Sequence, residues 1–242
     1  MPKIKFSLLS IIGGLTLLSS SAYAGVDAEV SYILNTLLFL IGGFLVMWMA
    51  AGFAMLESGL VTSKSVATIA AKNIGLYSIA GLMFWLVGYN LAYGIPEGGF
   101  IGSFLPWSDA SAVDTGYSDG SDWFFQMVFC ATTCSIVSGT LAERIKIWPF
   151  FLFCAILAGV IYPIEMGWQW GGGHLAAAGF SDFAGSTLVH SAGAAAALAG
   201  ALLLGPRLGR FTDSGEAAPM APFASSSIPL ATLGVFILWM GW

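Results

Sequence analysis

Long apolar stretches recur through this chain of 242 residues and are separated by short polar connections. Only 9% of the residues are charged and 57% are hydrophobic, whereas an average soluble domain has roughly 25% charged residues. Each stretch approaches the ~20 residues that a helix needs to cross a bilayer, and the alternation typical of membrane β-strands is missing. The sequence therefore predicts an all-α integral membrane protein, a polytopic helical bundle.

Six membrane-spanning helices are predicted after the first 24 residues. They cover residues 32–55, 66–93, 123–141, 148–162, 187–204 and 228–242. Glycine and alanine recur within these runs, as in residues 50–54 and 191–201. Small residues let helix backbones approach closely in a membrane, so we expect a tightly packed bundle.

The first 24 residues have the layout of a secretory signal peptide. A basic start is followed by an apolar core over residues 6–18 and by the small-residue motif Ala-Tyr-Ala that ends at Ala24. We therefore expect residues 1–24 to be a signal peptide and residues 25–242 to form the membrane domain. The alternative is an additional membrane helix, for which the apolar core is short.

The charged residues predict the orientation of the helices. The basic residues of the mature chain lie in or beside the first, third and fifth connections, and they are Lys64, Lys72, Arg144, Lys146, Arg207 and Arg210. Such connections face the cytoplasm, so we expect the protein in the cell (inner) membrane with its mature N-terminus outside the cytoplasm. The second connection carries only acidic charges, namely Glu97, Asp109, Asp114, Asp119 and Asp122. These acidic residues form a rim that would concentrate cations outside the membrane. The chain has no basic patch, so we do not expect it to bind nucleic acid.

The stretch from Ser181 to His190 places ionisable groups at the start of an apolar helix. Asp182 stands where a helix N-cap belongs, and Ser186 and Thr187 offer a second possible start. At ~1.5 Å of rise per residue, His190 then lies about one turn inside the hydrocarbon. An ionisable ring at that depth indicates a functional site, and the alternative is a core histidine satisfied by a backbone carbonyl.

Three aromatic side chains suggest a cation site and a gate. Phe125 and Phe129 are four residues apart and share one helix face, where they either fill a helix interface or close a pore by excluding water. Trp170 is followed by three glycines, which let the backbone approach closely and could hold the indole toward a vestibule. Trp168 fits an interfacial belt, and His174 fits a solvated loop.

The sequence carries no familiar catalytic or metal-binding pattern. Cys130, Cys134 and Cys154 fall within apolar runs, so we expect neither a disulfide framework nor a metal or cofactor site. A Walker sequence and a Gly-x-Ser-x-Gly motif are both missing, and we do not expect an enzyme. We expect Glu57 to be a terminal charge at the interface and Lys72 to reach the cytoplasm along its aliphatic stem.

Five stretches together resemble the ammonium transporter family, the ammonium and methylammonium permeases related to Rhesus glycoproteins. They are Ala51-Gly-Phe-Ala-Met-Leu-Glu-Ser-Gly-Leu60, Phe125-Gln-Met-Val-Phe129, Ser138-Gly-Thr-Leu-Ala-Glu-Arg-Ile145, Trp170-Gly-Gly-Gly173 and Asp182-Phe-Ala-Gly-Ser-Thr-Leu-Val-His190. The resemblance implies an eleven-helix subunit made of two inverted halves and a last helix, assembled as a homotrimer. This chain corresponds to the first half of that fold and part of the sixth span.

The resemblance also implies a role for each candidate residue. Trp170 is similar to a vestibule residue that holds ammonium by a cation–π contact, and Phe125 and Phe129 are similar to the outer gate. Asp182 is similar to a buried aspartate that orders the entry backbone, and His190 to the first of two pore histidines. The implied substrate is ammonium or ammonia, with methylammonium as an analogue, and the implied partner is a cytoplasmic PII-type regulatory protein.

Two alternatives to transport stay open on the sequence. In the first, the same fold binds ammonium and signals through a fused or docked cytoplasmic partner, which makes it a sensor. In the second, the chain is a fragment that does not conduct, because it corresponds to little more than half of the family's fold.

Overall fold

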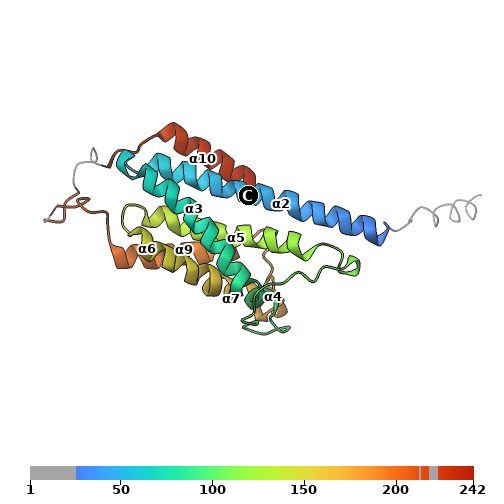
Figure 1. The fold of residues 1–242 in the computed structure, drawn as a ribbon. Coiled ribbons are helices and arrows are strands. Elements are labelled where there is room, and N and C mark those ends of the chain that lie inside the picture. Colours follow the sequence, from blue (N-terminus) through green and yellow to red (C-terminus); the bar gives the residue numbers. More distant parts are fainter. Residues whose placement is uncertain (1–25, 213, 218–222) are drawn as a thin grey trace, which may run out of the picture.

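The computed structural model describes residues 26–212, 214–217 and 223–242, and the expected signal peptide at residues 1–24 lies outside the described residues. Figure 1 shows helices running side by side in an elongated bundle. In the described part of the chain, the only β-type pairing is an isolated bridge between Phe211 and Ala217. The prediction of an all-α bundle is confirmed.

The helices follow the six predicted spans. The principal ones are α2 (Ala28–Leu60), α3 (Val66–Met83), α5 (Asp119–Leu141), α6 (Ile147–Ile156), α9 (Leu188–Leu204) and α10 (Ile228–Gly241). One turn of π-helix joins α3 to α4 (Tyr89–Tyr93), another joins α6 to α7 (Tyr162–Gly167), and the short α8 covers His174–Ala177. Among the residues that the structure describes, four continuous helical segments are long and apolar enough to cross a membrane, and they are Ala28–Leu60, Ser63–Tyr93, Asp119–Leu141 and Ile147–Gly167.

The first and fourth spans extend furthest beyond their predicted bounds. Asp27 accepts a hydrogen bond from the backbone N–H of Glu29 at 3.0 Å, so α2 begins before the apolar run does. The fourth span continues past Tyr162 to Gly167. Pro163 does not stop it, because proline is tolerated in the first turn of a helix and α7 starts anew after the π-turn.

Close backbone contacts hold the bundle together. Helix α10 packs along α2 (Figure 1), and a Cβ atom added at Gly52 would lie 2.5 Å from the backbone N of Leu238. Helix α5 contacts α2, α3 and α9, and a Cβ at Gly193 would lie 2.8 Å from Ile136 on α5. The small residues therefore set the distances between helices, as the sequence predicts.

The expectation for Glu57 and Lys72 was wrong. Both side chains are buried, with 3% and 4% of their surface exposed, and Lys72 Nζ lies 2.9 Å from Glu57 Oε2. Ser138 donates a hydrogen bond to the same carboxylate oxygen at 2.8 Å. Each charge offsets the desolvation of the other, which removes the need for Lys72 to reach water.

A second carboxylate joins three connections at the end of the bundle that carries the basic residues. Glu143 accepts hydrogen bonds from the Thr62 and Ser65 hydroxyls. It also forms an ion pair with Arg207, in which Arg207 Nη1 lies 2.6 Å from Glu143 Oε2. Its φ of 61° is the one positive value for a non-glycine residue in the described part of the chain. Burial raises the pKa of Glu143, but the hydrogen bonds from Thr62, Arg207 and Ser65 outweigh burial and lower the pKa to about 2.

Candidate functional site

A cavity of about 470 Å³ lies at the end of the bundle opposite the basic connections. It is lined by Phe39, Tyr89, Tyr93, Tyr117, Asp122, Phe125, Gln126, Phe129, Trp170 and Phe183, and we call it the aromatic cavity. Three of the five predicted site residues, Phe125, Phe129 and Trp170, belong to this lining. Of the remaining two, Asp182 lies on the segment that leads into α9, and His190 lies in the first turn of α9.

Aromatic rings form a continuous series along the cavity wall. The ring centroids of Phe39 and Phe125 are 5.3 Å apart, those of Phe125 and Phe129 are 5.1 Å apart, and those of Phe129 and Trp170 are 5.6 Å apart. All three pairs meet edge to face, the arrangement that aromatic quadrupoles favour. Phe125 and Phe129 thus pack against their neighbours and also face the cavity.

Helices α2 and α5 place the phenylalanines. Phe125 and Phe129 are one helical turn apart on α5, so both side chains point to one face. On the facing helix, a Cβ at Gly42 would lie 2.8 Å from the Phe125 ring. Gly42 therefore leaves the space that the Phe125 ring occupies, because any side chain there would overlap the ring.

The segment around Trp170 owes its geometry to glycine, as the sequence predicts. A Cβ at Gly171 would overlap the carbonyl oxygen of Ala92, and Gly172 has a φ of 76°. Trp170 donates a hydrogen bond from its indole Nε1 to the backbone oxygen of Asp182 at 2.7 Å. This bond fixes the indole, so one of its faces remains for the cavity and for Phe129.

Asp182 stabilises the segment before α9, although Thr187 and not Asp182 occupies the N-cap position of that helix. The helix begins at Leu188 after Thr187, which matches the second start that the sequence offers. The Asp182 carboxylate is buried and accepts hydrogen bonds from the backbone N–H groups of Gly185, Thr187 and Leu188 at 2.8–2.9 Å. It therefore satisfies donors that a helix start leaves unpaired, from outside the helix.

His190 lies in the first turn of α9. Its Nδ1 is 3.3 Å from the backbone oxygen of Gly185, and its ring stacks on Trp242, which directly follows α10, with centroids 4.4 Å apart. A carbonyl oxygen can only accept, so this contact favours the tautomer with a proton on Nδ1 and leaves Nε2 as an acceptor. His190 therefore has the backbone carbonyl partner expected of a core histidine, and it still keeps one ring nitrogen that can accept a hydrogen bond from a ligand.

Gly185 connects the aspartate to the histidine. Its N–H donates to Asp182, its oxygen faces His190, and its φ is 84°. A Cβ there would lie 2.9 Å from the Trp170 ring. The five predicted residues therefore form one series of contacts that runs from Phe125 to His190.

The sequence reasoning misplaced Asp122 and did not single out the other six lining residues, which are Phe39, Tyr89, Tyr93, Tyr117, Gln126 and Phe183. Asp122 was expected on a solvated acidic rim, but only 6% of it is exposed and it faces the cavity. It accepts a hydrogen bond from the Tyr89 hydroxyl at 2.6 Å and one from Gln126 Nε2 at 3.3 Å. Gln126 follows Asp122 by four residues on α5, so the contact between them could be predicted from the spacing. The contact between Asp122 and Tyr89 joins two different helices and could not be predicted in this way.

His174 was also misplaced. It begins α8, and its ring stacks on Phe100 with centroids 4.2 Å apart. Trp168 donates from Nε1 to the backbone oxygen of Phe100 at 2.9 Å. These residues therefore hold the loops together, and His174 is not a freely solvated side chain.

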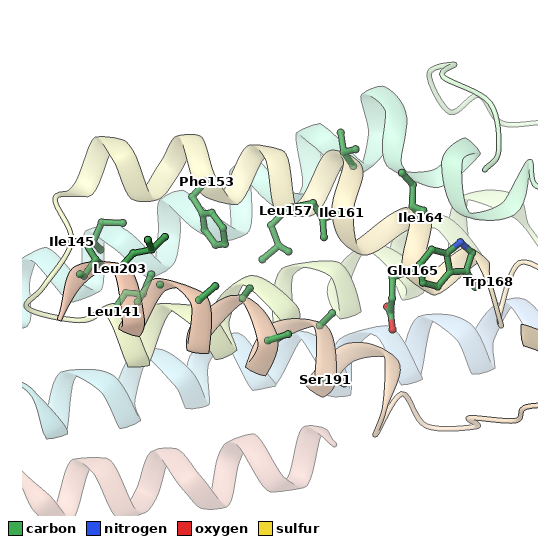
Figure 2. A pocket seen from close by; sticks show the side chains of 17 residues that line it. Leu141, Ile145, Phe153, Leu157, Ile161, Ile164, Glu165, Trp168, Ser191 and Leu203 are labelled. Carbon is green, nitrogen blue, oxygen red and sulfur yellow. The ribbon is translucent and has the colours of Figure 1, made fainter. Parts of the chain in front are cut away.

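Another cavity is larger than the aromatic cavity. It is an apolar groove of about 760 Å³ between the α6–α7 segment and α9, shown in Figure 2. Glu165, Trp168 and Ser191 lie at one end of it, and aliphatic residues and Phe153 line most of the rest. A cation needs acceptors along its path, so the smaller aromatic cavity is the better candidate site.

Metal chemistry finds no support in the side chains. Within residues 26–212, 214–217 and 223–242, no group of three His, Cys, Asp or Glu residues could hold a metal ion. The three cysteines are buried and free, which suits packing residues.

The sequence profile of the Ammonium Transporter Family matches residues 37–242. The chain belongs to the ammonium transporter family. Curated members are similar along most of the chain. Ammonium transporter Amt2 of Archaeoglobus fulgidus is 41% identical over 218 residues, which are 84% of this chain and 44% of that protein. The ammonium transporter of Aquifex aeolicus is 35% identical over 234 residues, which are 94% of this chain and 52% of that protein. The chain thus spans about half the length of these relatives.

Solved structures of the family have the same fold. A structure titled Sensor Amt Protein is 34% identical with a TM-score of 0.77, and the match covers 86% of this chain and 52% of that one. The crystal structure of Candida albicans Mep2 is 25% identical with a TM-score of 0.73, and the match covers 90% of this chain and 48% of that one. The helical bundle described above is therefore part of the ammonium transporter fold, and the chain is a membrane protein.

Proposed function

We propose that the complete protein moves ammonium or ammonia across a membrane, and that the aromatic cavity recruits the cation. The observation that supports this most strongly is the series of contacts from Phe125 through Phe129, Trp170 and Asp182 to His190. A cation over an indole face gains about 0.5–2 kcal/mol. Trp170 is the indole that the cavity offers, held by its bond to Asp182.

The phenylalanines act as the gate in this proposal. Phe125 and Phe129 belong to the cavity lining, and in this scheme their rings exclude water, because an apolar constriction dewets readily. Ammonium that enters so dry a passage loses several kcal/mol of hydration. The passage therefore requires either the loss of a proton at the gate or polar groups beyond it.

His190 supplies the polar group beyond the gate. With Nδ1 engaged by Gly185, Nε2 accepts a hydrogen bond from an N–H of ammonia or ammonium. Potassium has a similar size but no N–H donor, so it cannot make this bond. Asp182 does not touch the substrate in this scheme and holds the start of α9 in place.

The family assignment extends the proposal to the assembly and its surroundings. We propose that residues 1–24 are a signal peptide, that residues 25–242 form part of the membrane domain, and that the mature N-terminus lies outside the cytoplasm of the cell (inner) membrane. The complete protein would form a homotrimer. A PII-type regulatory protein would bind the cytoplasmic face, where the basic connections and Glu143 lie.

A sensor role is less well supported than transport. The curated relatives from Archaeoglobus fulgidus and Aquifex aeolicus carry the names of transporters. One similar structure is titled Sensor Amt Protein, which describes that protein. A non-conducting fragment stays the other alternative, and methylammonium uptake by cells that express residues 1–242 alone tests it.

Uptake of labelled methylammonium by cells that lack their own ammonium permeases tests the proposal. The complete product of the gene should give saturable uptake that ammonium chloride inhibits and potassium chloride does not. Background uptake, in cells whose membranes contain the protein, would contradict transport and would favour a sensor or a non-conducting protein.

A further inference from the structure

Asp122 is a buried carboxylate on the wall of the aromatic cavity. Both of its side-chain partners are neutral, because Tyr89 donates a hydroxyl to Oδ2 and Gln126 donates an amide to Oδ1. In the described part of the chain, the two ion pairs within 4.0 Å are Lys72 with Glu57 and Arg207 with Glu143. The Asp122 carboxylate therefore lacks a counter-ion among the described residues.

A buried carboxylate without a counter-ion is costly. Removing a charge from water carries a penalty of several kcal/mol, and two neutral hydrogen bonds, one of them 3.3 Å long, recover only part of it. Of the described residues that line the cavity, none is a lysine or an arginine. The positive charge that would balance Asp122 can therefore come from a cation that enters the cavity.

Other groups in the wall define the chemistry of that cation. Gln126 Oε1 is buried and has no hydrogen-bond partner among the described residues, although leaving a buried acceptor unpaired is unfavourable. The rings of Tyr89 and Tyr93 lie beside Asp122, with centroids 4.9 Å apart. A carboxylate, a free amide oxygen and aromatic faces suit a small cation that carries N–H donors.

We propose that Asp122 is the counter-ion of the recruited cation and sets the affinity of the aromatic cavity for ammonium and methylammonium, with Gln126 as an additional acceptor. This inference rests on the proposed function, because it concerns the same cavity. It goes beyond that function because it adds a charge to a site otherwise built from aromatic rings. Ion pairing in a partly desolvated cavity is stronger than in water, so the carboxylate discriminates cations from neutral molecules of the same size.

The competing explanation is that Asp122 only anchors the fold. Its bond with Tyr89 joins α4 to α5, and any change to the aspartate also weakens that bond. The two explanations differ for Asp122→Asn, whose amide oxygen can still accept from the Tyr89 hydroxyl but carries no charge. If Asp122 serves as counter-ion, a folded Asp122→Asn variant loses cation affinity, and if it serves only as anchor, that variant keeps its affinity.

The test measures binding rather than transport, so that it does not depend on conduction. Ammonium chloride is titrated calorimetrically into the complete purified protein in detergent, with sodium chloride as the control titrant. Asp122→Asn should raise the Kd about tenfold, the loss expected when a charge-assisted contact becomes neutral. Asp119→Asn is the matched control, since that carboxylate accepts from the backbone of Ala110 and is no part of the cavity lining, and it should leave the Kd unchanged.

Three results would overturn the inference. They are an unchanged Kd for a folded Asp122→Asn variant, an equal rise in Kd for Asp122→Asn and the Asp119→Asn control, and no measurable ammonium binding by the wild-type protein. A normal pattern of binding with no methylammonium uptake would instead support the inference and contradict only the transport function. Thermal unfolding of each variant shows whether it is folded, and a folded Asp122→Glu variant should recover part of the affinity.

Discussion

The Asp182 carboxylate should matter more for stability than other acidic side chains of the loops. Asp182→Ala removes the acceptor of three backbone N–H groups at the start of α9, and we expect a loss of about 2 kcal/mol, the upper end for helix caps. Thermal unfolding in detergent measures the change. Asp114→Ala, at an exposed position, is the control, and equal midpoints for the two variants would contradict the role of Asp182.

Single residues also show how far sequence reasoning reaches. Trp170, Asp182 and His190 could be picked out because glycines, an N-cap position and an ionisable group in an apolar run are local signals. The pairing of Lys72 with Glu57 and that of Asp122 with Tyr89 could not. These pairs join different helices, and hydrophobic periodicity does not fix which residues of two helices meet.

The contact between α2 and α10 should not tolerate a larger residue. A Cβ at Gly234 would lie 2.5 Å from the backbone N of Leu56, and backbone cannot move aside as a flexible side chain can. We therefore expect Gly234→Val to lower the free energy of unfolding by about 1–3 kcal/mol, the usual cost of overpacking. Gly120→Ala is the control, because the nearest atom to its Cβ would be the Ser118 hydroxyl at 3.6 Å. Unchanged unfolding of Gly234→Val would show that the helices are not packed this closely.

The connections around Glu143 should depend on pH. Hydrogen bonds and the Arg207 ion pair lower its folded-state pKa to about 2, below the ~4.3 of an unfolded glutamate. A depressed pKa gives stability that is present above the unfolded value and disappears as the pH falls through the folded value. The advantage of wild type over Glu143→Gln in thermal unfolding should therefore be full above about pH 5 and shrink toward pH 2. A difference that is constant over this range would contradict the assignment.

The helices were predicted better than their ends. All six runs are helical, because a long apolar run with few charges has few other stable structures in a membrane. The fourth span was cut short at Tyr162, since Pro163 and Glu165 look like the end of a run. The π-turn before Tyr162 restarts the helix, and such a local change in hydrogen bonding has no clear sequence signal.

The distribution of charged residues predicts how the whole molecule is oriented in the membrane, and labelling can test this prediction. Cysteines introduced at the exposed positions Asp114 and Ser214 should react with a membrane-impermeant maleimide from opposite sides, Asp114→Cys from outside and Ser214→Cys from the cytoplasm. The three native cysteines are buried, so the background should be low. Labelling of both positions from the same side, or in the reversed order, would contradict the proposed topology.

The role of His190 in the complete protein distinguishes a conducting path from a packing arrangement. His190→Ala should leave folding and oligomeric state largely intact, because the ring is only half-buried and its polar contact is to the backbone. The control is His174→Ala, which changes the other histidine of the chain. Both variants are reconstituted into vesicles beside the wild type, and methylammonium uptake and potassium leak are measured together. We predict that His190→Ala loses selective methylammonium uptake while His174→Ala keeps it. Uptake by His190→Ala at the wild-type rate with unchanged selectivity would mean that the ring only fills the core, and it would contradict the proposed ammonium path.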